Sequence, residues 1–378
     1  MKLDPIRECQ SQAQRIVIKV GSSTLTRDGK LRARKFSELA HSVCQLMDAG
    51  REVVLVSSGA IAAGSHRLGW SQTGRSIPEM QAAAAIGQIS LVDIYQRRFA
   101  RYGRHVGQVL LTRAGLHDRE RFLNARHTLH ELLRLGTVPI VNENDTVATE
   151  EIRFGDNDSL SATVVNLIGA ELLIIVTDVE GLYASPPVPG RRRPELIDVV
   201  ERITPEIETA AKGTEGTFAR GGMTTKLEAA RIAARSGAAT VVCSGRRADT
   251  LARVVAGESV GTLFLPGERM ASRKHWLAFT TRTQGTLQLD PGAANAVVTA
   301  GGSLLPAGIA SVDGEFGVGD PVLCVTADGR KLARGLSAYS SGDIERIKGI
   351  AAKEIAQVLG YSNGPEVIHR DDLVILDD

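Results

Sequence analysis

The sequence predicts an α/β fold in which helices cover an open, mainly parallel sheet, followed by a small β-rich domain. Up to about residue 265, short runs rich in Val, Ile and Leu alternate with longer Ala- and Leu-rich segments of helical period. This alternation is typical of strands joined by crossover helices. Beyond that point the chain is rich in glycine and has short alternating apolar runs, which indicates a small β domain.

Six apolar runs predict the strands of the parallel sheet. They cover residues 15–20, 52–57, 105–111, 137–141, 172–177 and 239–243. Helices are predicted between the strands, for example at 35–49 and 121–135, where apolar residues recur on one face. Gly50 and Gly136 follow these two helices and are the expected glycine C-caps.

The length of 378 residues predicts two domains, because a domain usually holds about 100 to 200 residues. We expect the α/β domain at 13–265, a linker at 266–282, the β-rich domain at 283–362 and a C-terminal tail at 363–378. Within the β-rich domain, the runs TLQL, VLCV and KLARGL predict strands.

The composition favours a small-molecule partner. Lys and Arg number 45 against 43 Asp and Glu, a net charge of +2, so no overall field attracts nucleic acid or anionic lipid. The four cysteines lack the spacing of a zinc site or a disulfide framework. No run approaches the roughly 18 apolar residues of a membrane span, and the first residues carry no apolar leader. We expect a cytoplasmic protein with no membrane partner and no metal ligands of its own.

Unusual polar sequence follows several predicted strands, and ligands of open parallel sheets bind at the carboxyl ends of the strands. Lys19 interrupts the apolar strand in "IVIKVGSSTL", and Gly21 then opens a donor-rich turn that suits phosphate. Ser58 follows the next strand in "VSSGAIAAG". Taken singly, Lys19 is better explained as a lysine that snorkels to an edge, and a helix cap explains one of the two serine hydroxyls.

Two acidic segments follow the same pattern. "VPIVNENDT" places Asp145 after a buried strand, where a solvated loop is the alternative interpretation. "GDNDSLSA" crowds Asp156, Asn157 and Asp158 before a helix, although one polar side chain suffices as a cap. Capping therefore leaves two of these three residues unexplained.

Two further segments complete the set. Thr177 and Asp178 end the strand "LLIIVT", where turn formation is the simpler explanation. "ARGGMTTKLEAA" places Lys226 in the first turn of a helix, where a cation opposes the helix dipole and needs an anion nearby. Neither a dinucleotide fingerprint nor a Walker A loop fits these segments.

These parts suit phosphoryl transfer, which needs positioning and neutralisation of negative charge. None of the eight histidines lies in the polar segments, so no general base is evident. A carboxylate acceptor needs none, because with a pKa of about 4.3 it is already ionised at pH 7. Asp145 and Asp156 suit the α-ammonium group of an amino acid. This favours a free amino acid as acceptor over an N-acylated one.

The motifs "IVIKVGSSTLT", "VSSGAIAAG", "VPIVNENDTVATEEIRFGDNDSLSA", "TDVEGLY" and "GGMTTKLEAA", in this order, resemble the amino-acid kinase family. They are most similar to its glutamate-phosphorylating members, and "GSLLPAGIASVDGEFGVGDPVLCV" resembles the PUA domain that many of these carry. The resemblance covers nearly all of residues 13–375. It implies an eight-stranded αβα sandwich that uses ATP, with Mg²⁺ arriving on the nucleotide, to convert L-glutamate to L-glutamyl 5-phosphate, the first step of proline biosynthesis.

The resemblance also implies roles for single residues. Lys19 and Lys226 match the lysines that stabilise the phosphoryl group, and Asp158 matches an acid that organises them. Glutamate contacts are implied for Ser58, Asp145 and Asn157, with Asp156 beside the substrate. Nucleotide contacts are implied for Lys19, Thr177, Asp178, Arg220, Gly221, Gly222, Met223, Thr224, Thr225 and Lys226. One departure is Ala219-Arg220, where the family usually has Gly-Thr, so this loop is expected to contact phosphate differently.

Alternative functions are an N-acetylglutamate kinase, an aspartokinase and an RNA-binding PUA protein. Against RNA, residues 283–362 hold six Lys and Arg and eight Asp and Glu, and Phe316 and Tyr339 make a poor stacking platform. From the resemblance we expect a homo-oligomer, either a dimer or a tetramer, and feedback inhibition by proline. We also expect hand-over of the product to a glutamyl-phosphate reductase.

Overall fold

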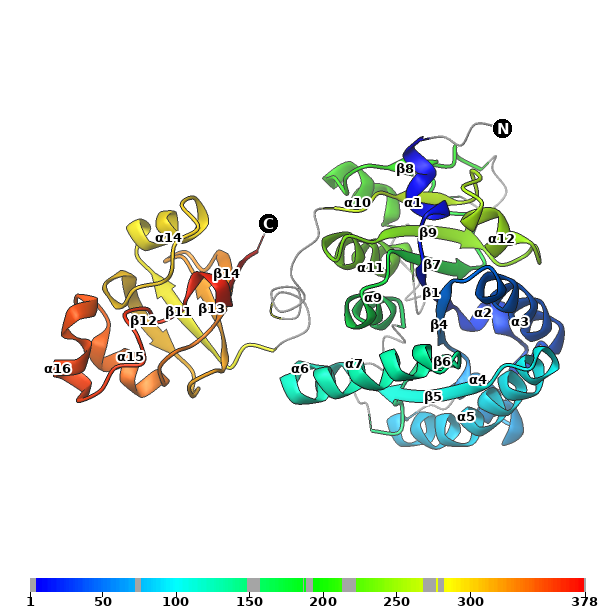
Figure 1. Cartoon of the computed structure of the whole chain (residues 1–378), viewed down its shortest axis with the longest axis horizontal. Helices are drawn as coiled ribbons and strands as arrows, with labels where there is room; N and C mark the ends of the chain where they lie inside the picture. The colour runs from blue at the N-terminus through cyan, green and yellow to red at the C-terminus, as the bar shows by residue number, and fades with distance from the viewer. Residues whose placement is uncertain are drawn as a thin grey trace. The chain divides into compact units, whose positions relative to one another are not determined.

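The computed structural model describes residues 5–71, 76–147, 157–185, 187, 193–212, 222–267, 277 and 282–376. The chain divides into two compact units, Met1–Arg269 and Met270–Asp378 (Figure 1). The ends assigned above to the domains and to the linker at 266–282 stay a prediction, and most of that linker lies outside the described residues.

The larger unit is built on an eight-stranded sheet with the order β5-β6-β4-β1-β7-β9-β10-β8. In that order the strands are Val106–Leu111, Val138–Glu143, Glu52–Ser57, Arg15–Val20, Leu172–Thr177, Ala239–Ser244, Thr262–Phe264 and Val199–Val200. The first six are parallel, whereas β10 runs antiparallel to β9 and parallel to β8. All six predicted strands are confirmed. The short β8 and β10 were missed because two or three residues carry no periodic signal.

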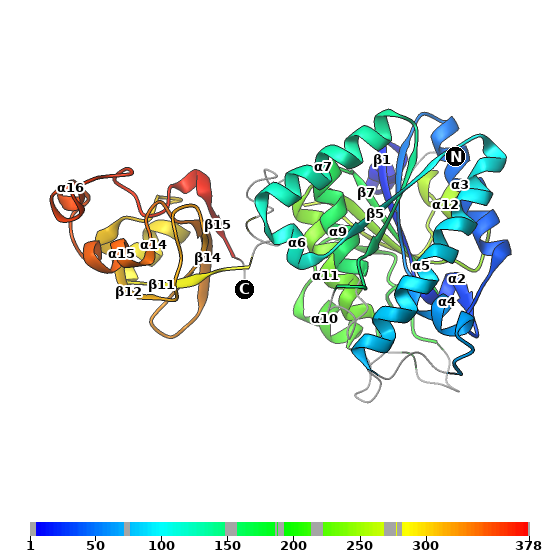
Figure 2. The same cartoon turned by 90° about the horizontal axis from the view of Figure 1, so that it is seen from below.

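Helices cover both faces of this sheet, as Figure 2 shows. One layer holds α3 Ala33–Asp48, α4 Ala60–Arg67, α5 Ile77–Phe99 and α12 Thr250–Val255, and the other holds α7 Arg119–Arg134, α9 Asn157–Ile168, α10 Pro205–Ala211 and α11 Met223–Arg235. Shorter elements are α1 Glu8–Ser11, α2 Ser22–Leu25, β2 Thr26–Arg27, β3 Lys30–Leu31 and α6 Arg113–His117. The αβα sandwich is confirmed. Gly50 and Gly136 follow α3 and α7 with φ of +84° and +67°, as predicted.

Strand alternation decides which way Lys19 points. Ile16, Ile18 and Val20 of β1 belong to the main core cluster, which includes Phe36 of α3. Side chains alternate between the two faces of a strand, so Lys19 projects into the opposite layer, toward α9.

Among the described residues, no helix is both long and apolar enough to cross a bilayer.

The smaller unit has a five-stranded sheet with the order β12-β11-β13-β14-β15. Its elements are β11 Gly285–Leu289, α14 Pro291–Val298, β12 Ile309–Asp313, β13 Pro321–Val325, β14 Lys331–Leu336, α15 Ser341–Ile347, α16 Ile355–Leu359 and β15 Leu373–Ile375. The three predicted runs form β11, β13 and β14. β15 lies beyond residue 362, so part of the segment expected to be a tail completes the sheet by pairing with β14.

Candidate active site

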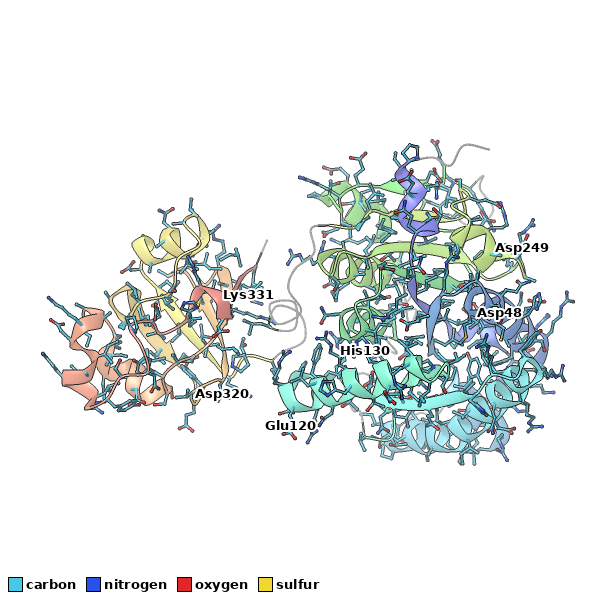
Figure 3. The ribbon with its side chains drawn as sticks, viewed as in Figure 1. Asp48, Glu120, His130, Asp249, Asp320 and Lys331 are labelled. Atoms are coloured by element: carbon cyan, nitrogen blue, oxygen red, sulfur yellow. The ribbon has the colours of Figure 1, made fainter. Side chains whose placement is uncertain are left out.

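Three charged side chains are buried together at the carboxyl edge of the sheet. Charges such as Asp48 and Asp249 lie exposed on the outside of the larger unit (Figure 3). Lys19, Asp158 and Lys226, by contrast, are only 5%, 1% and 3% exposed. Burying a charge destabilises the folded state unless the charge is paired. The distances among these three side chains therefore decide whether the fold can accommodate them.

The two lysines share one carboxylate. Lys19 Nζ lies 2.6 Å from Asp158 Oδ1, and Lys226 Nζ lies 3.1 Å from Asp158 Oδ2. The hydroxyl of Thr225 donates to the same Oδ2 at 2.7 Å and to the Gly222 carbonyl at 2.8 Å. Among the described residues, two cations therefore share one anion in this cluster.

Helix positions explain why this arrangement forms. Asp158 lies in the first turn of α9, where the helix dipole favours a negative charge. Lys226 lies in the first turn of α11, where the dipole is unfavourable, and Asp158 supplies the anion that this position needs. Burial raises the pKa of Asp158, but Lys19 and Lys226, with hydrogen bonds from Lys19 and Thr225, outweigh burial and hold this pKa below its usual range.

A group of neutral polar side chains lies beside the ionic cluster. Asn157 Nδ2 lies 3.0 Å from the Ser57 carbonyl oxygen, 2.8 Å from Ser58 Oγ and 2.9 Å from Asn142 Oδ1, three acceptors that share its two protons. Asn157 is buried, and its Oδ1 has no hydrogen-bond partner among the described residues. The ends of β4 and β6 and the start of α9 thus leave one inward-facing acceptor.

The remaining predicted residues lie near the same edge or outside the described chain. Thr177 ends β7, next to β1 in the sheet, and its hydroxyl donates to Asp178 at 3.1 Å. Asp145 is half-buried in the loop after β6. Gly222 precedes α11, and Met223, Thr224 and Thr225 begin it. Asp156, Arg220 and Gly221 lie outside the described residues, as does Ala219.

Residues 14–244 match the amino acid kinase family. The chain belongs to this family. Residues 285–359 match the PUA domain. Both assignments agree with the resemblance found in the sequence.

Full-length relatives in the amino acid kinase family are similar along the whole chain. The chain is 50% identical to glutamate 5-kinase of Moorella thermoacetica, over 98% of this chain and 99% of that protein. It is also 50% identical to glutamate 5-kinases of Cupriavidus pinatubonensis (97% and 99%) and Pseudomonas syringae pv. tomato (96% and 98%). The fold is similar to carbamate kinase from Giardia lamblia bound to AMP-PNP, with a TM-score of 0.50 and 16% identity over 68% of this chain and 99% of that chain.

Two polar residues of this amino acid kinase were missed as site candidates. Asn142, near the end of β6, lies in the polar segment "VPIVNENDT". That segment was interpreted through its acidic residues, so Asn142 was not named as a site residue. Gln88 lies on α5 and accepts from Asn142 Nδ2 at 2.9 Å. A lone glutamine in an Ala-rich helix is ordinarily a surface residue, so only the tertiary structure indicates its position.

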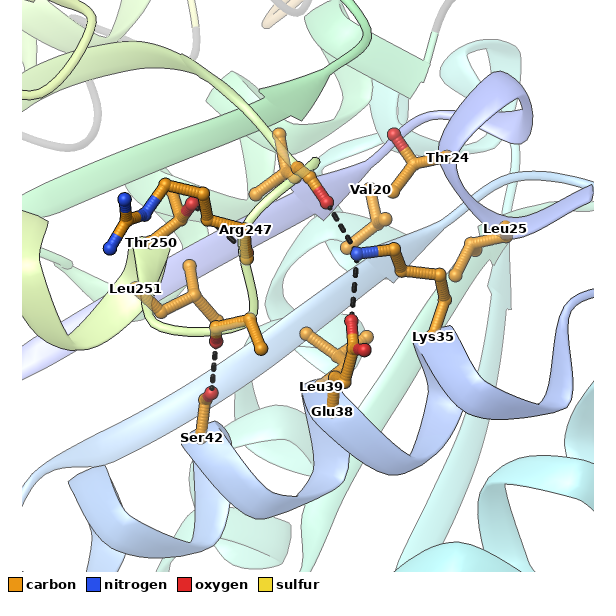
Figure 4. Close-up of a pocket in the computed structure, with 13 residues that line it drawn as sticks. Val20, Thr24, Leu25, Lys35, Glu38, Leu39, Ser42, Arg247, Thr250 and Leu251 are labelled. Atoms are coloured by element: carbon orange, nitrogen blue, oxygen red, sulfur yellow. Dashed lines mark hydrogen bonds and ion pairs between the residues drawn. The ribbon is translucent and has the colours of Figure 1, made fainter.

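A separate small pocket lies on the other face of the sheet, between α3 and the loop before α12. Figure 4 shows Lys35 there, with its Nζ bonded to Glu38 at 2.7 Å and to the Gly245 carbonyl at 2.9 Å. The pocket holds about 40 Å³ and is lined by both apolar residues, such as Val20 and Leu251, and polar ones, such as Ser42 and Thr250. This volume suits a few waters and is far too small for a nucleotide, so we assign Lys35 a structural role.

Replacing Asp158 with Asn should destabilise the larger unit by about 3–5 kcal/mol, because two buried ammonium groups lose their carboxylate. Urea unfolding followed by circular dichroism measures this loss. The contribution of Asp158 is present above its unfolded pKa of about 3.9 and is lost as the pH falls through its lower folded pKa. The difference between wild type and variant should therefore shrink below about pH 4.

The matched control is Asp249→Asn, which removes an exposed carboxylate that lies 2.6 Å from Arg247. Exposed ion pairs contribute little, so this variant should unfold almost like the wild type. Equal losses in the two variants would contradict the stabilising role assigned to Asp158.

Proposed function

We propose that the chain transfers the γ-phosphoryl group of ATP to the side-chain carboxylate of L-glutamate, giving L-glutamyl 5-phosphate. The observation that carries the proposal is the pair of buried lysines held on one carboxylate at the carboxyl edge of the sheet. The 50% identity to glutamate 5-kinases over nearly the full length supports the choice of acceptor.

The chemistry needs charge neutralisation more than proton transfer. An oxygen of the glutamate side chain attacks the γ-phosphorus, the bond to the oxygen bridging to the β-phosphorus breaks, and ADP leaves with that electron pair. Lys19 and Lys226 would stabilise the charge on the transferring group. Asp158 orients both ammonium groups, and their excess positive charge remains available for phosphate. The attacking carboxylate is already ionised at pH 7, so no base is required.

The neutral polar group would bind the amino-acid end of the substrate. Ser58 Oγ accepts from Asn157, so the hydroxyl proton of Ser58 is available to a carboxylate. Asn157 Oδ1 is an acceptor suited to an ammonium N–H. Asp145 and Asp156 would add negative charge near the ammonium group. An N-acylated substrate offers no such cation, which makes N-acetylglutamate the weaker candidate.

Mg²⁺ is proposed to enter with the nucleotide phosphates. In the described part of the chain, no three His, Cys, Asp or Glu side chains gather as a metal site, and Asp158 already pairs with two lysines. Contacts to the nucleotide are proposed for Thr177, Asp178 and the segment 220–226.

The PUA unit is proposed to have a structural or regulatory role. Phe316 and Tyr339 lie in its hydrophobic core, where they offer no exposed ring on which a base could stack. Inhibition by proline, a dimeric or tetrameric state and product hand-over to a glutamyl-phosphate reductase stay predictions from the resemblance. A cytoplasmic location stays a prediction from the composition.

The proposed reaction can be tested by trapping the acyl phosphate with hydroxylamine. With MgATP, L-glutamate should yield a hydroxamate, and N-acetylglutamate and L-aspartate should yield far less. A larger hydroxamate yield with N-acetylglutamate than with L-glutamate would contradict the proposal and favour an N-acetylglutamate kinase.

Lys19→Ala and Lys226→Ala should each lower kcat by about 100-fold or more, because each removes a cation that faces the transferring phosphoryl group. The hydroxamate assay measures kcat, and circular dichroism verifies folding. The matched control is Lys35→Met, since Lys35 is another largely buried lysine of the same unit. Near-normal turnover in either alanine variant would refute the role of that lysine.

Asp145→Asn should raise the KM for glutamate about tenfold and leave the KM for ATP nearly unchanged, because the lost charge faces the ammonium group rather than phosphate. Steady-state kinetics with each substrate varied in turn measures both constants. A selective effect on ATP would place this loop on the nucleotide side instead.

A further inference from the structure

The amide orientations beside the ionic cluster follow from two backbone groups. The Glu143 N–H can only donate, and it donates to Asn142 at 2.9 Å, so the Asn142 atom facing it is the oxygen. The Ser57 carbonyl can only accept, so the Asn157 atom facing it is the nitrogen. These two fixed ends determine the direction of every hydrogen bond between them.

Gln88 closes this chain of amides. Because Asn142 Oδ1 serves Glu143 and Asn157, Asn142 Nδ2 must find an acceptor elsewhere, and Gln88 Oε1 accepts it at 2.9 Å. The order Gln88–Asn142–Asn157 is thus a directional relay from α5 through β6 to α9. At the α9 end of this relay, the buried Asn157 Oδ1 has no hydrogen-bond partner in the described part of the chain.

The surrounding helix is built to hold Gln88 in place. A Cβ added at Gly87 would lie 1.8 Å from the Ala60 carbonyl oxygen, so α5 packs with its backbone against the start of α4, directly after Ser58. Tyr95, two turns along α5 from Gln88, places its hydroxyl 2.9 Å from Ser57 Oγ. The helix α5 therefore contacts the start of α4 through Gly87 and the end of β4 through Tyr95.

The cost of burying Gln88 points to a use beyond packing. Its side chain is 9% exposed, and its Nε2 has no hydrogen-bond partner among the described residues. A buried amide that satisfies only one end costs stability. Such exceptions tend to occur where function requires them.

We propose that Gln88 is a positioning residue for the amino-acid substrate. By accepting from Asn142 Nδ2, it holds the Asn142 amide in the orientation that the Glu143 N–H sets, and so supports the Asn157 amide with an oxygen rather than an NH₂ group toward the substrate ammonium. This inference rests on the proposed function and names a residue that selects a free α-ammonium group without touching it.

The test compares Gln88→Met, Gln88→Glu and the control Leu91→Met, a buried change on the same helix. Methionine fills a similar volume but cannot accept from Asn142, so the KM for glutamate should rise about 3- to 10-fold with the KM for ATP unchanged. Glutamate at position 88 keeps an acceptor for Asn142, so the KM for glutamate should stay within about twofold of wild type, whereas the added charge should lower kcat. A role in packing alone predicts the reverse order, because methionine suits a buried site better than a carboxylate.

The wild type separates the two hypotheses. If wild type forms no hydroxamate with glutamate, the proposed function fails, and this inference fails with it. If wild type is active and Gln88→Met keeps its KM for glutamate, only the role of Gln88 is overturned. Should Gln88→Met not fold, Asn142→Asp removes the same donor while keeping the acceptor for Glu143 and Asn157. It must then raise the KM for glutamate by a similar factor.

Discussion

One carboxylate shared by two buried lysines is the constraint on which the catalytic unit depends. Asp158 stabilises Lys19 and Lys226 at 2.6 and 3.1 Å, and neither ammonium group would be tolerable at this depth without it. The three residues come from β1, α9 and α11. The ionic cluster therefore ties the central strand to two helices of one layer, and its geometry is correct only when all three are packed together.

The same cluster explains why the site suits phosphate without a general base. One negative charge between two positive ones leaves an excess that only a further anion completes. A protein that merely needed a stable core would do better with apolar side chains of similar volume at these positions. Under the proposed function, binding of a nucleotide phosphate offsets this cost and connects the stability of the fold to its chemistry.

The sequence alone predicts those parts of this structure that have a periodic or local signal. The apolar run around Lys19 forms β1. The ends of α3 and α7 are predictable because Gly50 and Gly136 adopt the positive φ that favours glycine after a helix. The sequence also indicates that Lys226 needs an anion, because a helix N-terminus opposes a cation. The tertiary structure decides which anion pairs with Lys226. From the sequence, Asp158 was predicted to organise the lysines only because of the resemblance to the amino-acid kinase family.

Gln88 shows most clearly where local signals end. From the sequence of an alanine-rich helix, a buried glutamine cannot be told from a solvated one. The role inferred for Gln88 depends on its hydrogen bond with Asn142, 54 residues away. Neutral amides suit this task better than charged groups. A charged residue beside Lys19 and Asp158 would change the field at the phosphoryl group, because Coulomb interactions reach several ångströms in a buried site. Hydrogen-bonded amides set a direction without adding net charge, so in the proposed reaction they would orient the ammonium end of the substrate and leave the charge of the lysines unchanged for the phosphate.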